Sequence, residues 1–236
     1  MNNKRCLAVI TARGGSKGLK GKNKRLLLGK PLINWTIAAA LESNYVNKVL
    51  VSTDDKEIAT ISEDAGAWVP FVRPSNLSGD QASHIDTVLH AISWVEDKET
   101  EVFDYIVLLQ PTLPFRTCDD IDESIGLIIE RNVSSVIGLT EVDDNPALFK
   151  KMSDDLVLEN YYNDVIEKDL RRQDCGSVYK INGAIYLCSI NFLKSSKSWY
   201  GNDSIGHVMP ASRSVDIDTE QDLLFAEFLA KNASFD

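Results

Sequence analysis

Short apolar runs, bounded by polar and turn-forming residues, alternate along most of the chain with segments of helical periodicity. The apolar runs predict buried strands, and the periodic segments predict amphipathic helices. The predicted strands are 6–12, 48–53, 67–72, 104–109, 134–140 and 183–189. The predicted helices are 32–43, 55–66, 84–97, 118–131 and 219–232. This alternation indicates a layered α/β domain with a mostly parallel sheet.

Two of the predicted helices carry start signals. Thr117 is followed three residues later by Asp120, and Thr219 is followed at the same distance by Asp222. Both pairs resemble a capping box in which Asp replaces Glu, so each Thr is expected to begin a helix.

Residues 141–180 interrupt this rhythm, because the segment is polar, rich in Asp and Asn, and without a clear period. A stretch of about 40 residues is too long for an ordinary connection within a compact domain. We therefore expect a single domain over residues 1–236 with an inserted lobe at 141–180. The apolar residues of this lobe would be buried in a symmetric homodimer, as a dimer arm from which Lys150 or Lys151 reaches the neighbouring site.

The composition is that of an ordinary globular protein of 236 residues, with 44% hydrophobic and 25% charged residues. No apolar run approaches the roughly 18 residues of a membrane-spanning helix, and no signal-peptide pattern is present, so we expect a cytoplasmic protein without membrane contact. Neither the cysteines nor the histidines show metal-ligand spacing, so free thiols are expected in place of a zinc site or a disulfide. These residues are Cys6, Cys118, Cys175, Cys188, His84, His90 and His207.

Positive charge gathers near the N-terminus, although the chain as a whole has a net charge of −10. Nine lysines and arginines precede Glu42, which is the first acidic residue. The acidic balance of the whole chain argues against a nucleic-acid partner, because nucleic-acid phosphates need a broad basic face. The basic cluster therefore needs a more local explanation.

The segment ARGGSKGLKGKN (12–23) lies at the centre of this cluster, directly after the first predicted strand. It does not fit the dinucleotide fingerprint, because Arg13 stands where the first glycine should be. It does not fit the P-loop either, because the spacing between its glycines is too long. Its glycines would let backbone amides approach an anion that Arg13, Lys17 and Lys22 neutralise. A nucleoside triphosphate matches these features, and the alternative is a solvated basic loop. The position after a buried strand, without nearby acids to pair these cations, favours phosphate binding.

The segment VDIDT (215–219) carries a second candidate site. In an extended chain, Asp216 and Asp218 point to one face about 7 Å apart, while Val215 and Ile217 point to the other. Mg²⁺ prefers oxygen ligands and is usually held by one or two carboxylates together with substrate phosphates, and Mn²⁺ is a possible substitute. The alternative is that these acids only lead into the cap of the last helix. Next to a triphosphate site, the metal interpretation is favoured.

Four segments in order resemble the cytidylyltransferases that activate sialic acids, the CMP-N-acylneuraminate synthetases. They are ARGGSKGLKGKN (12–23), LLQPTLPFRT (108–117), RRQD with NGAIY (171–174 and 182–186) and SVDIDTEQDL (214–223). The resemblance covers nearly the whole chain. It implies a three-layer, Rossmann-like nucleotidyltransferase domain with a protruding dimerisation lobe.

The resemblance also assigns roles to residues. It implies that the nucleotide is held by Arg13, Ser16, Lys17, Lys22, Asn23 and Arg73. It implies that Lys22 is catalytic and that Asp216 and Asp218 are catalytic residues that bind the metal. For the sugar it nominates Ser83, Gln110, Arg172, Asn182 and Tyr186.

Three residues qualify these assignments. On the sequence alone, Arg172 is equally a solvated residue of the lobe. Arg116 is expected to be structural and to tie its loop to the following helix. Many sialic-acid enzymes of the family have Arg where this chain has Lys180. Lysine keeps the positive charge but lacks the planar guanidinium that can make two parallel hydrogen bonds.

The implied reaction transfers CMP from CTP to the anomeric hydroxyl of a nonulosonic acid such as N-acetylneuraminic acid and releases pyrophosphate. The sugar's own hydroxyl would be the nucleophile, in keeping with the lack of a recognisable Ser-His-Asp or Cys-His arrangement. One alternative is the same reaction on legionaminic or pseudaminic acid. Another is a non-catalytic module that binds nucleotide sugars, since a fold does not fix a function. The presence of both Asp216 and Asp218 favours the enzyme.

Overall fold

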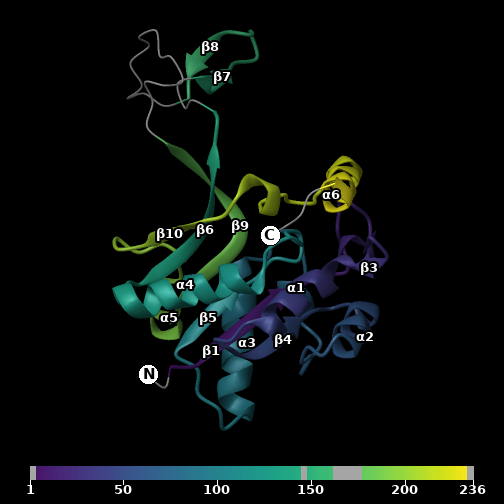
Figure 1. Cartoon of the computed structure of the whole chain (residues 1–236), viewed down its shortest axis with the longest axis vertical. Helices are drawn as coiled ribbons and strands as arrows, with labels where there is room; N and C mark the ends of the chain where they lie inside the picture. Colours follow the sequence, from purple (N-terminus) through teal and green to yellow (C-terminus); the bar gives the residue numbers. More distant parts are fainter. Residues whose placement is uncertain (1–3, 145–147, 162–176, 233–236) are drawn as a thin grey trace.

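A six-stranded sheet with helices on both faces forms the body of the protein (Figure 1). The structure is a computed structural model that describes residues 4–144, 148–161 and 177–232. The strand order is β10-β6-β9-β5-β1-β4, and β9 is antiparallel to both of its neighbours while the other pairs are parallel. The strands are β1 (Cys6–Thr11), β4 (Val46–Ser52), β5 (Tyr105–Leu108), β6 (Ser135–Val142), β9 (Val178–Ser189) and β10 (Ile205–Val208). A mostly parallel sheet is therefore confirmed.

Five of the six predicted strands are present, and the prediction for 67–72 is wrong. That segment forms only two isolated bridges, Leu50 with Trp68 and Thr53 with Val72. Pro70 lies between the bridges and has no N–H to donate, which prevents a continuous ladder. The short β10 was not predicted, because its four residues include a glycine and a histidine.

All five predicted helices are present within a few residues of their expected bounds. They are α1 (Leu32–Glu42), α2 (Lys56–Asp64), α3 (His84–Lys98), α4 (Cys118–Arg131) and α6 (Glu220–Asn232). A sixth helix, α5 (Ile190–Ser196), follows β9 without a loop, and its seven residues are too few to show a period. The remaining short elements are η1 (Lys22–Lys24), β2 (Leu26–Leu27), β3 (Lys30–Pro31), η2 (Ser75–Leu77) and η5 (Ala211–Arg213).

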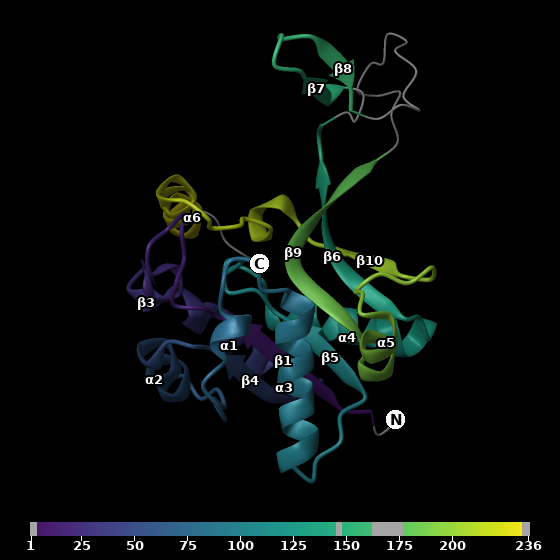
Figure 2. The same ribbon diagram turned by 180° about the vertical axis from the view of Figure 1, so that it is seen from behind.

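Alternate residues of the central strand β1 enter two separate hydrophobic clusters. Ala8 and Ile10 pack with residues of α1, α2 and α4, whereas Leu7 and Val9 pack with residues of α3 and α5. A strand that is buried on both faces reads as a continuous apolar run, which is what made β1 predictable. Figure 2 shows the face that α3 and α5 cover. The predicted three-layer architecture is thus confirmed.

A third, smaller cluster joins the C-terminal helix to the loops above the sheet. Leu223 and Ala226 of α6 pack with Leu27 and with Ile217 of the predicted metal segment. The segment that carries Asp216 and Asp218 is therefore fixed by its own apolar residues.

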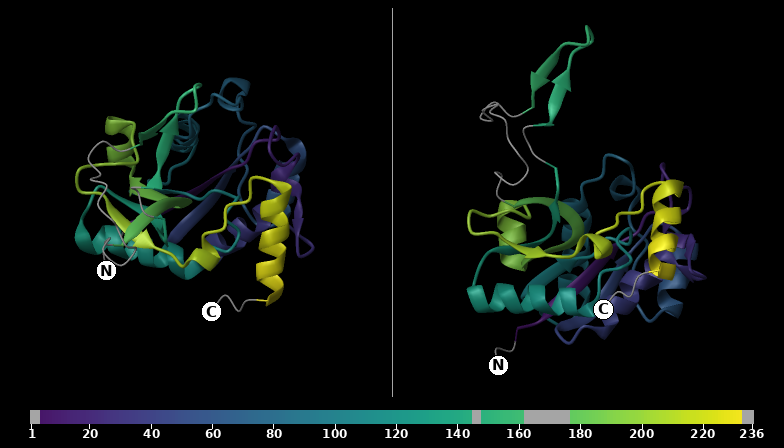
Figure 3. Two further views of the ribbon diagram at one scale, coloured as in Figure 1. Left: turned by 90° about the horizontal axis from the view of Figure 1, so that it is seen from above. Right: turned by 45° about the horizontal axis from the view of Figure 1, so that its top comes forward.

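The described part of 141–180 forms an arm that stands away from the body (Figures 1 and 3). Its base is a continuation of the sheet, in which Leu139–Val142 of β6 pair with Val178–Ile181 of β9. Its far end is a hairpin of β7 (Lys150–Met152) and β8 (Leu158–Asn160). Many apolar side chains of this part are exposed: Leu148, Phe149, Met152, Leu156, Val157, Leu158 and Tyr161. The dimer itself stays a prediction.

The motif NGAIY (182–186) lies where the arm meets the body. Pairing between β6 and β9 shifts register between Ile137 and Leu139, so residues 182–185 bulge out of the ladder. Gly183 has a φ of +84° at this bulge, a conformation that glycine adopts without strain.

Within the three ranges that the structure describes, every helix is too short or too polar to span a lipid bilayer.

Candidate active site

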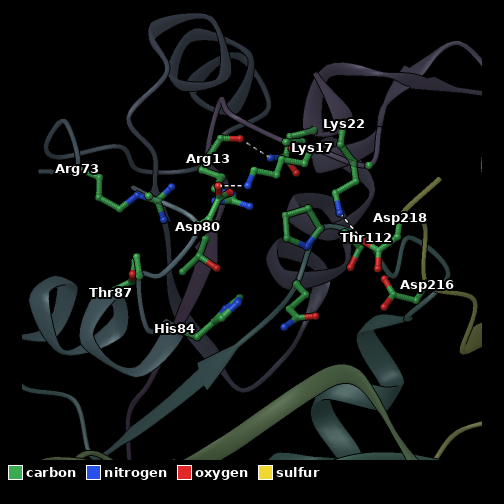
Figure 4. Close-up of a pocket in the computed structure, with 18 of the residues that line it drawn as sticks. Arg13, Lys17, Lys22, Arg73, Asp80, His84, Thr87, Thr112, Asp216 and Asp218 are labelled. Atoms are coloured by element: carbon green, nitrogen blue, oxygen red, sulfur yellow. Dashed lines mark hydrogen bonds and ion pairs between the residues drawn. The ribbon is translucent and has the colours of Figure 1, made fainter. Parts of the chain in front are cut away.

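A cavity of about 560 Å³ opens beyond the carboxyl ends of β1 and β5 (Figure 4). Open α/β sheets bind their ligands at this edge. Nine of the predicted site residues line the cavity: Arg13, Ser16, Lys17, Lys22, Asn23, Arg73, Gln110, Asp216 and Asp218. The cavity thus unites the basic loop after the first strand with an acidic segment almost 200 residues later in the sequence.

Two glycines of the basic loop are required by close contacts. A Cβ atom at Gly18 would lie 2.5 Å from the backbone oxygen of Asp218, and a Cβ atom at Gly14 would lie 2.8 Å from Oδ2 of Asp55. The loop is further held by Asn23, whose buried Nδ2 donates to the carbonyl of Arg13 at 3.0 Å. Asn23 therefore both lines the cavity and fixes the loop that carries the cations.

The cations of the loop are paired with acids from distant parts of the chain. Asp80 accepts from Nη1 of Arg13 at 2.8 Å and lies 2.5 Å from Nζ of Lys17. These two cations, Lys17 first, lower the pKa of the Asp80 carboxyl. The expectation that no acid pairs with the loop is therefore wrong. Folding brings Asp80 to the loop across more than 60 residues, a proximity that spacing along the sequence does not reveal.

Arg73 lies at another wall of the cavity, and its side chain is only 4% exposed. Its Nη2 lies 3.5 Å from Oδ1 of Asp54, but within the described part of the chain Nε and Nη2 have no hydrogen-bond acceptor. Burial lowers the pKa of Arg73, and the Asp54 charge opposes this shift. Buried donors without acceptors are costly, so a ligand that accepts from this guanidinium would be stabilised.

The acidic pair has the predicted alternation of faces. Asp216 and Asp218 line the cavity, whereas Val215 and Ile217 pack into the cluster under α6. The Ile217 N–H donates to the carbonyl of Thr112 at 2.9 Å, which anchors the extended backbone. Desolvation raises the pKa of the Asp216 carboxyl; a hydrogen bond from the Thr112 side chain opposes this shift, and the Asp218 charge adds to it.

The cap of α6 is formed by residues other than Asp218. Oδ2 of Asp222 accepts from the backbone N–H and hydroxyl of Thr219 at 2.7 and 2.8 Å, and Asp222 N–H donates back to that hydroxyl. The carboxylate of Asp218 instead accepts from Nζ of Lys22 at 2.6 Å (Figure 4). The predicted capping box is confirmed: the segment leads into this cap, and the Asp218 backbone N–H also donates to Asp222 at 3.0 Å, but the Asp218 carboxylate is not part of the cap. The box at Thr117 and Asp120 is also confirmed.

The donor set of the acidic pair fits one hard divalent cation. In residues 4–144, 148–161 and 177–232, no group of three or more His, Cys, Asp or Glu side chains could hold a metal. Two carboxylates on one cavity wall are nevertheless the usual protein share of a magnesium site that is completed by water and phosphate. Magnesium stays a prediction.

Of the residues nominated for the sugar, some line the cavity and others do not. Gln110 lines the cavity and packs against Gly183, where a Cβ would lie 2.9 Å from its Oε1. Ser83 caps α3, and its Oγ accepts from the N–H groups of Ile85 and Asp86. Ser83 is absent from the cavity lining, although Ala82 and His84 belong to it.

Asn182 and Tyr186 do not line the cavity, and Arg172 lies outside the described residues. The buried Asn182 amide donates to Leu139, Met209 and Ser214, and its Oδ1 accepts from Ala184 N–H. The Tyr186 ring packs against Trp199 with 5.7 Å between ring centroids. These contacts within the protein give both side chains structural roles, and their sugar contacts stay predictions.

Two arginines outside the predicted site fix its surroundings. Arg116 is buried and donates to the carbonyl of Ala184 at 2.8 Å and to the hydroxyl of Thr36 at 2.8 Å. Burial lowers its pKa to about 9. Arg116 is thus structural, as expected, but its hydrogen bonds tie the loop to α1 and β9 and not to the following helix. Arg213 donates to both oxygens of Asp120, which is 2% exposed, at 2.8 and 3.2 Å.

The residues of the cavity lining that sequence reasoning missed include Asp80, His84, Thr87 and Thr112. His84 begins α3, and partial desolvation together with the positive charges of Arg73 and Arg13 lowers its pKa. The position of His84 next to Ser83 and that of Thr112 two residues after Gln110 were usable signals. Nothing in the sequence around Asp80 indicated that it meets the basic loop.

Comparisons with known proteins agree with this geometry. The family described as Cytidylyltransferase matches residues 7–233. The chain is 36% identical over 228 residues to a CMP-N,N'-diacetyllegionaminic acid synthase of Legionella pneumophila, covering 95% of this chain and 96% of that protein. It is 33% identical over 224 residues to an N-acylneuraminate cytidylyltransferase of Escherichia coli, covering 93% of this chain but 51% of that protein.

The fold is also found in a solved structure of CMP:2-keto-3-deoxy-manno-octonic acid synthetase complexed with CTP. That structure matches with a TM-score of 0.71 at 19% identity, over 97% of this chain and 99% of the other. At this identity the likeness shows the fold alone. The family match and the two relatives, by contrast, extend over nearly all of the sequence that builds the cavity. The chain therefore belongs to the cytidylyltransferase family.

Proposed function

We propose that this cytidylyltransferase transfers CMP from CTP to the anomeric hydroxyl of a nonulosonic acid and releases pyrophosphate. The observation that carries the proposal is a single cavity in which Arg13 and Lys17 lie on one side, Asp216 and Asp218 lie on the other, and Lys22 contacts the acidic pair. Such a cavity suits a ligand that is anionic at one end and reacts next to a metal. The named activities of the relatives supply the substrate class.

The basic loop would hold the triphosphate. Arg13 and Lys17, with Ser16, would bind the outer phosphates that leave as pyrophosphate, and Asn23 and Arg73 would bind on the nucleoside side. Lys22 would offset the charge that develops at the attacked phosphorus. Nucleotidyl transfer depends mainly on positioning and charge stabilisation, so these side chains could supply most of the catalysis without a covalent intermediate.

Asp216 and Asp218 would hold Mg²⁺, with Mn²⁺ as a possible substitute. The ion would neutralise phosphate charge and lower the pKa of the sugar hydroxyl, which removes the need for a separate base. Thr112 would keep Asp216 in place through its side-chain hydrogen bond.

For the sugar we propose N-acetylneuraminic acid as the first candidate and legionaminic or pseudaminic acid as the second. The legionaminic acid synthase supports the second candidate, because it matches over nearly the full length of both chains. Lys180 bears on the choice only indirectly, since it is exposed on the arm strand β9. The need for CTP favours a cytoplasmic location.

The test is pyrophosphate release from CTP with Mg²⁺ and a panel of nine-carbon keto acids that includes all three sugars. We expect release that requires CTP, a divalent cation and one of these acids, and CMP-sugar in equal amount. Parallel reactions with ATP, GTP and UTP check the nucleotide. A protein that binds CTP and the sugars but releases no pyrophosphate would support the non-catalytic module.

A further inference from the structure

The carboxylate of Asp80 lies between the two cations that would hold the outer phosphates. One oxygen accepts from Arg13 at 2.8 Å, and the other lies 2.5 Å from Nζ of Lys17 (Figure 4). A phosphate offers the same donors the same kind of negatively charged oxygen atoms. The side chain of Asp80 thus makes with this loop the contacts that a bound phosphate would make.

Asp80 belongs to a surface turn that forms part of the cavity wall. The turn connects η2 to α3 and is closed by a hydrogen bond from Ala82 N–H to the carbonyl of Gly79 at 3.2 Å. The side chains are 34% exposed for Arg13, 41% for Asp80 and 78% for Lys17. Exposed pairs of this kind contribute little free energy, so a more highly charged anion can displace the carboxylate.

Resting on the proposed function, we propose that Asp80 is an internal anion that occupies the outer-phosphate position of the empty site and competes there with CTP and pyrophosphate. The triphosphate displaces Asp80 because it carries more charge and is also held by the rest of the cavity. After transfer, pyrophosphate has lost its link to the nucleoside. The return of Asp80 to Arg13 and Lys17 then favours the release of pyrophosphate. Product release is a step that often limits turnover.

A different role for Asp80 predicts the opposite result. If the carboxylate only holds Arg13 and Lys17 in the orientation that phosphate needs, its removal weakens binding of the anion. If it competes, its removal strengthens binding. The sign of the change therefore separates the two roles.

The experiment measures calorimetric binding of inorganic pyrophosphate, at fixed Mg²⁺, to the full chain and to Asp80→Asn. The substitution keeps the size of the side chain and removes its charge. We expect pyrophosphate to bind about three- to tenfold more tightly, the range that the loss of two exposed ion pairs allows. The gain should shrink as salt rises, because salt screens exposed charges.

Two further variants make the comparison specific. Asp86→Asn removes the same charge from the nearby first turn of α3, where the exposed side chain does not line the cavity, and should change binding less than about twofold. Asp80→Glu keeps the charge and should bind pyrophosphate about as weakly as the parent. If Asp80→Asn does not fold, Asp80→Ser replaces it.

Unchanged or weaker pyrophosphate binding by Asp80→Asn overturns the inference, and so does an equal gain in Asp86→Asn. Because this measurement uses neither sugar nor turnover, it is independent of the proposed reaction. Tighter binding in a protein that fails with every sugar would retain the internal anion and reject the proposed function.

Discussion

Lys22 is the cation that contacts the acidic pair directly. Its side chain is 17% exposed, and Nζ lies 2.6 Å from Asp218. We expect Lys22→Ala to lower the turnover number by about 10²–10³, the usual cost of losing one preorganised charge at a developing oxyanion. The melting temperature should change little, because an ion pair to an exposed carboxylate contributes only about 0–1 kcal/mol.

Lys24→Ala is the matched control for this variant. Lys24 belongs to the same short turn η1, but it pairs with Asp55 and Glu57 and does not line the cavity. Its removal should leave turnover within about twofold of the parent. Near-normal turnover of Lys22→Ala would show that Lys22 has no catalytic role.

Asp218 and Asp222 allow the proposed metal binding to be separated from capping of the helix. Asp218→Asn should leave the melting temperature unchanged, because Thr219 and Asp222 form the cap, and should lower turnover by at least about 10²-fold at low Mg²⁺. Asp222→Ala removes the cap and should cost about 1 kcal/mol of unfolding free energy. Its carboxylate also accepts from the Asp218 N–H at 3.0 Å, so turnover should fall, but far less than in Asp218→Asn. Parent-like turnover of Asp218→Asn at low Mg²⁺ would remove it from the metal site.

At the scale of elements, the segment from η5 to α6 is held at three points. Arg213 pairs with Asp120 of α4, Ser214 accepts from Asn182 of β9, and Ile217 donates to Thr112. These anchors come from helix α4, strand β9 and the loop after β5. Together with the apolar contacts of Val215 and Ile217, they set the position of Asp216 and Asp218.

Arg213→Lys tests the strongest anchor, because lysine keeps the charge and loses the two-pronged contact to the buried Asp120. We expect activity to need about three- to tenfold more Mg²⁺ for half-maximal rate, with a smaller change at saturating Mg²⁺. Arg25→Lys is the control, since Arg25 makes a similar but exposed contact to Glu220 at the start of α6. An equal Mg²⁺ requirement in both variants would show that the anchor does not position the acidic pair.

The sequence predicted the structure best where the environment of a side chain is determined by its neighbours along the chain. Buried strands such as β1 are continuous apolar runs, and the Thr219 cap is complete within four residues. By contrast, the pairing of Asp80 with Arg13 and the internal hydrogen bonds of Asn182 depend on contacts between distant segments. Residue type indicated only that these groups are polar. It did not indicate which partner each would find.

At the scale of the whole molecule, the described part of the arm exposes several large apolar side chains. Leu156 is 72% exposed and Leu158 is 64% exposed. We expect a homodimer at micromolar concentration that buries this surface, and Leu158→Asp should shift it toward monomer because a charge would be desolvated at the interface. Sedimentation velocity or light scattering measures the mass.

Val102→Asp is the control for the arm variant. Val102 is 78% exposed on the body, away from the arm, so the added charge should leave the mass unchanged. A parent protein that is monomeric over the same concentrations would contradict the dimer. Dissociation caused equally by both variants would place the interface somewhere other than on the arm.

The unbroken strand β9 gives the arm a mechanical connection to the cavity. Its first residues form the base of the arm, its last residues lie between β5 and β6 in the body, and the bulge at Gly183 separates the two parts beside Gln110. β9 therefore connects the arm directly to the body, with its bulge next to the cavity. A force applied to the arm would be transmitted along β9 to the bulge at Gly183, which adjoins the cavity residue Gln110, without an intervening helix or loop.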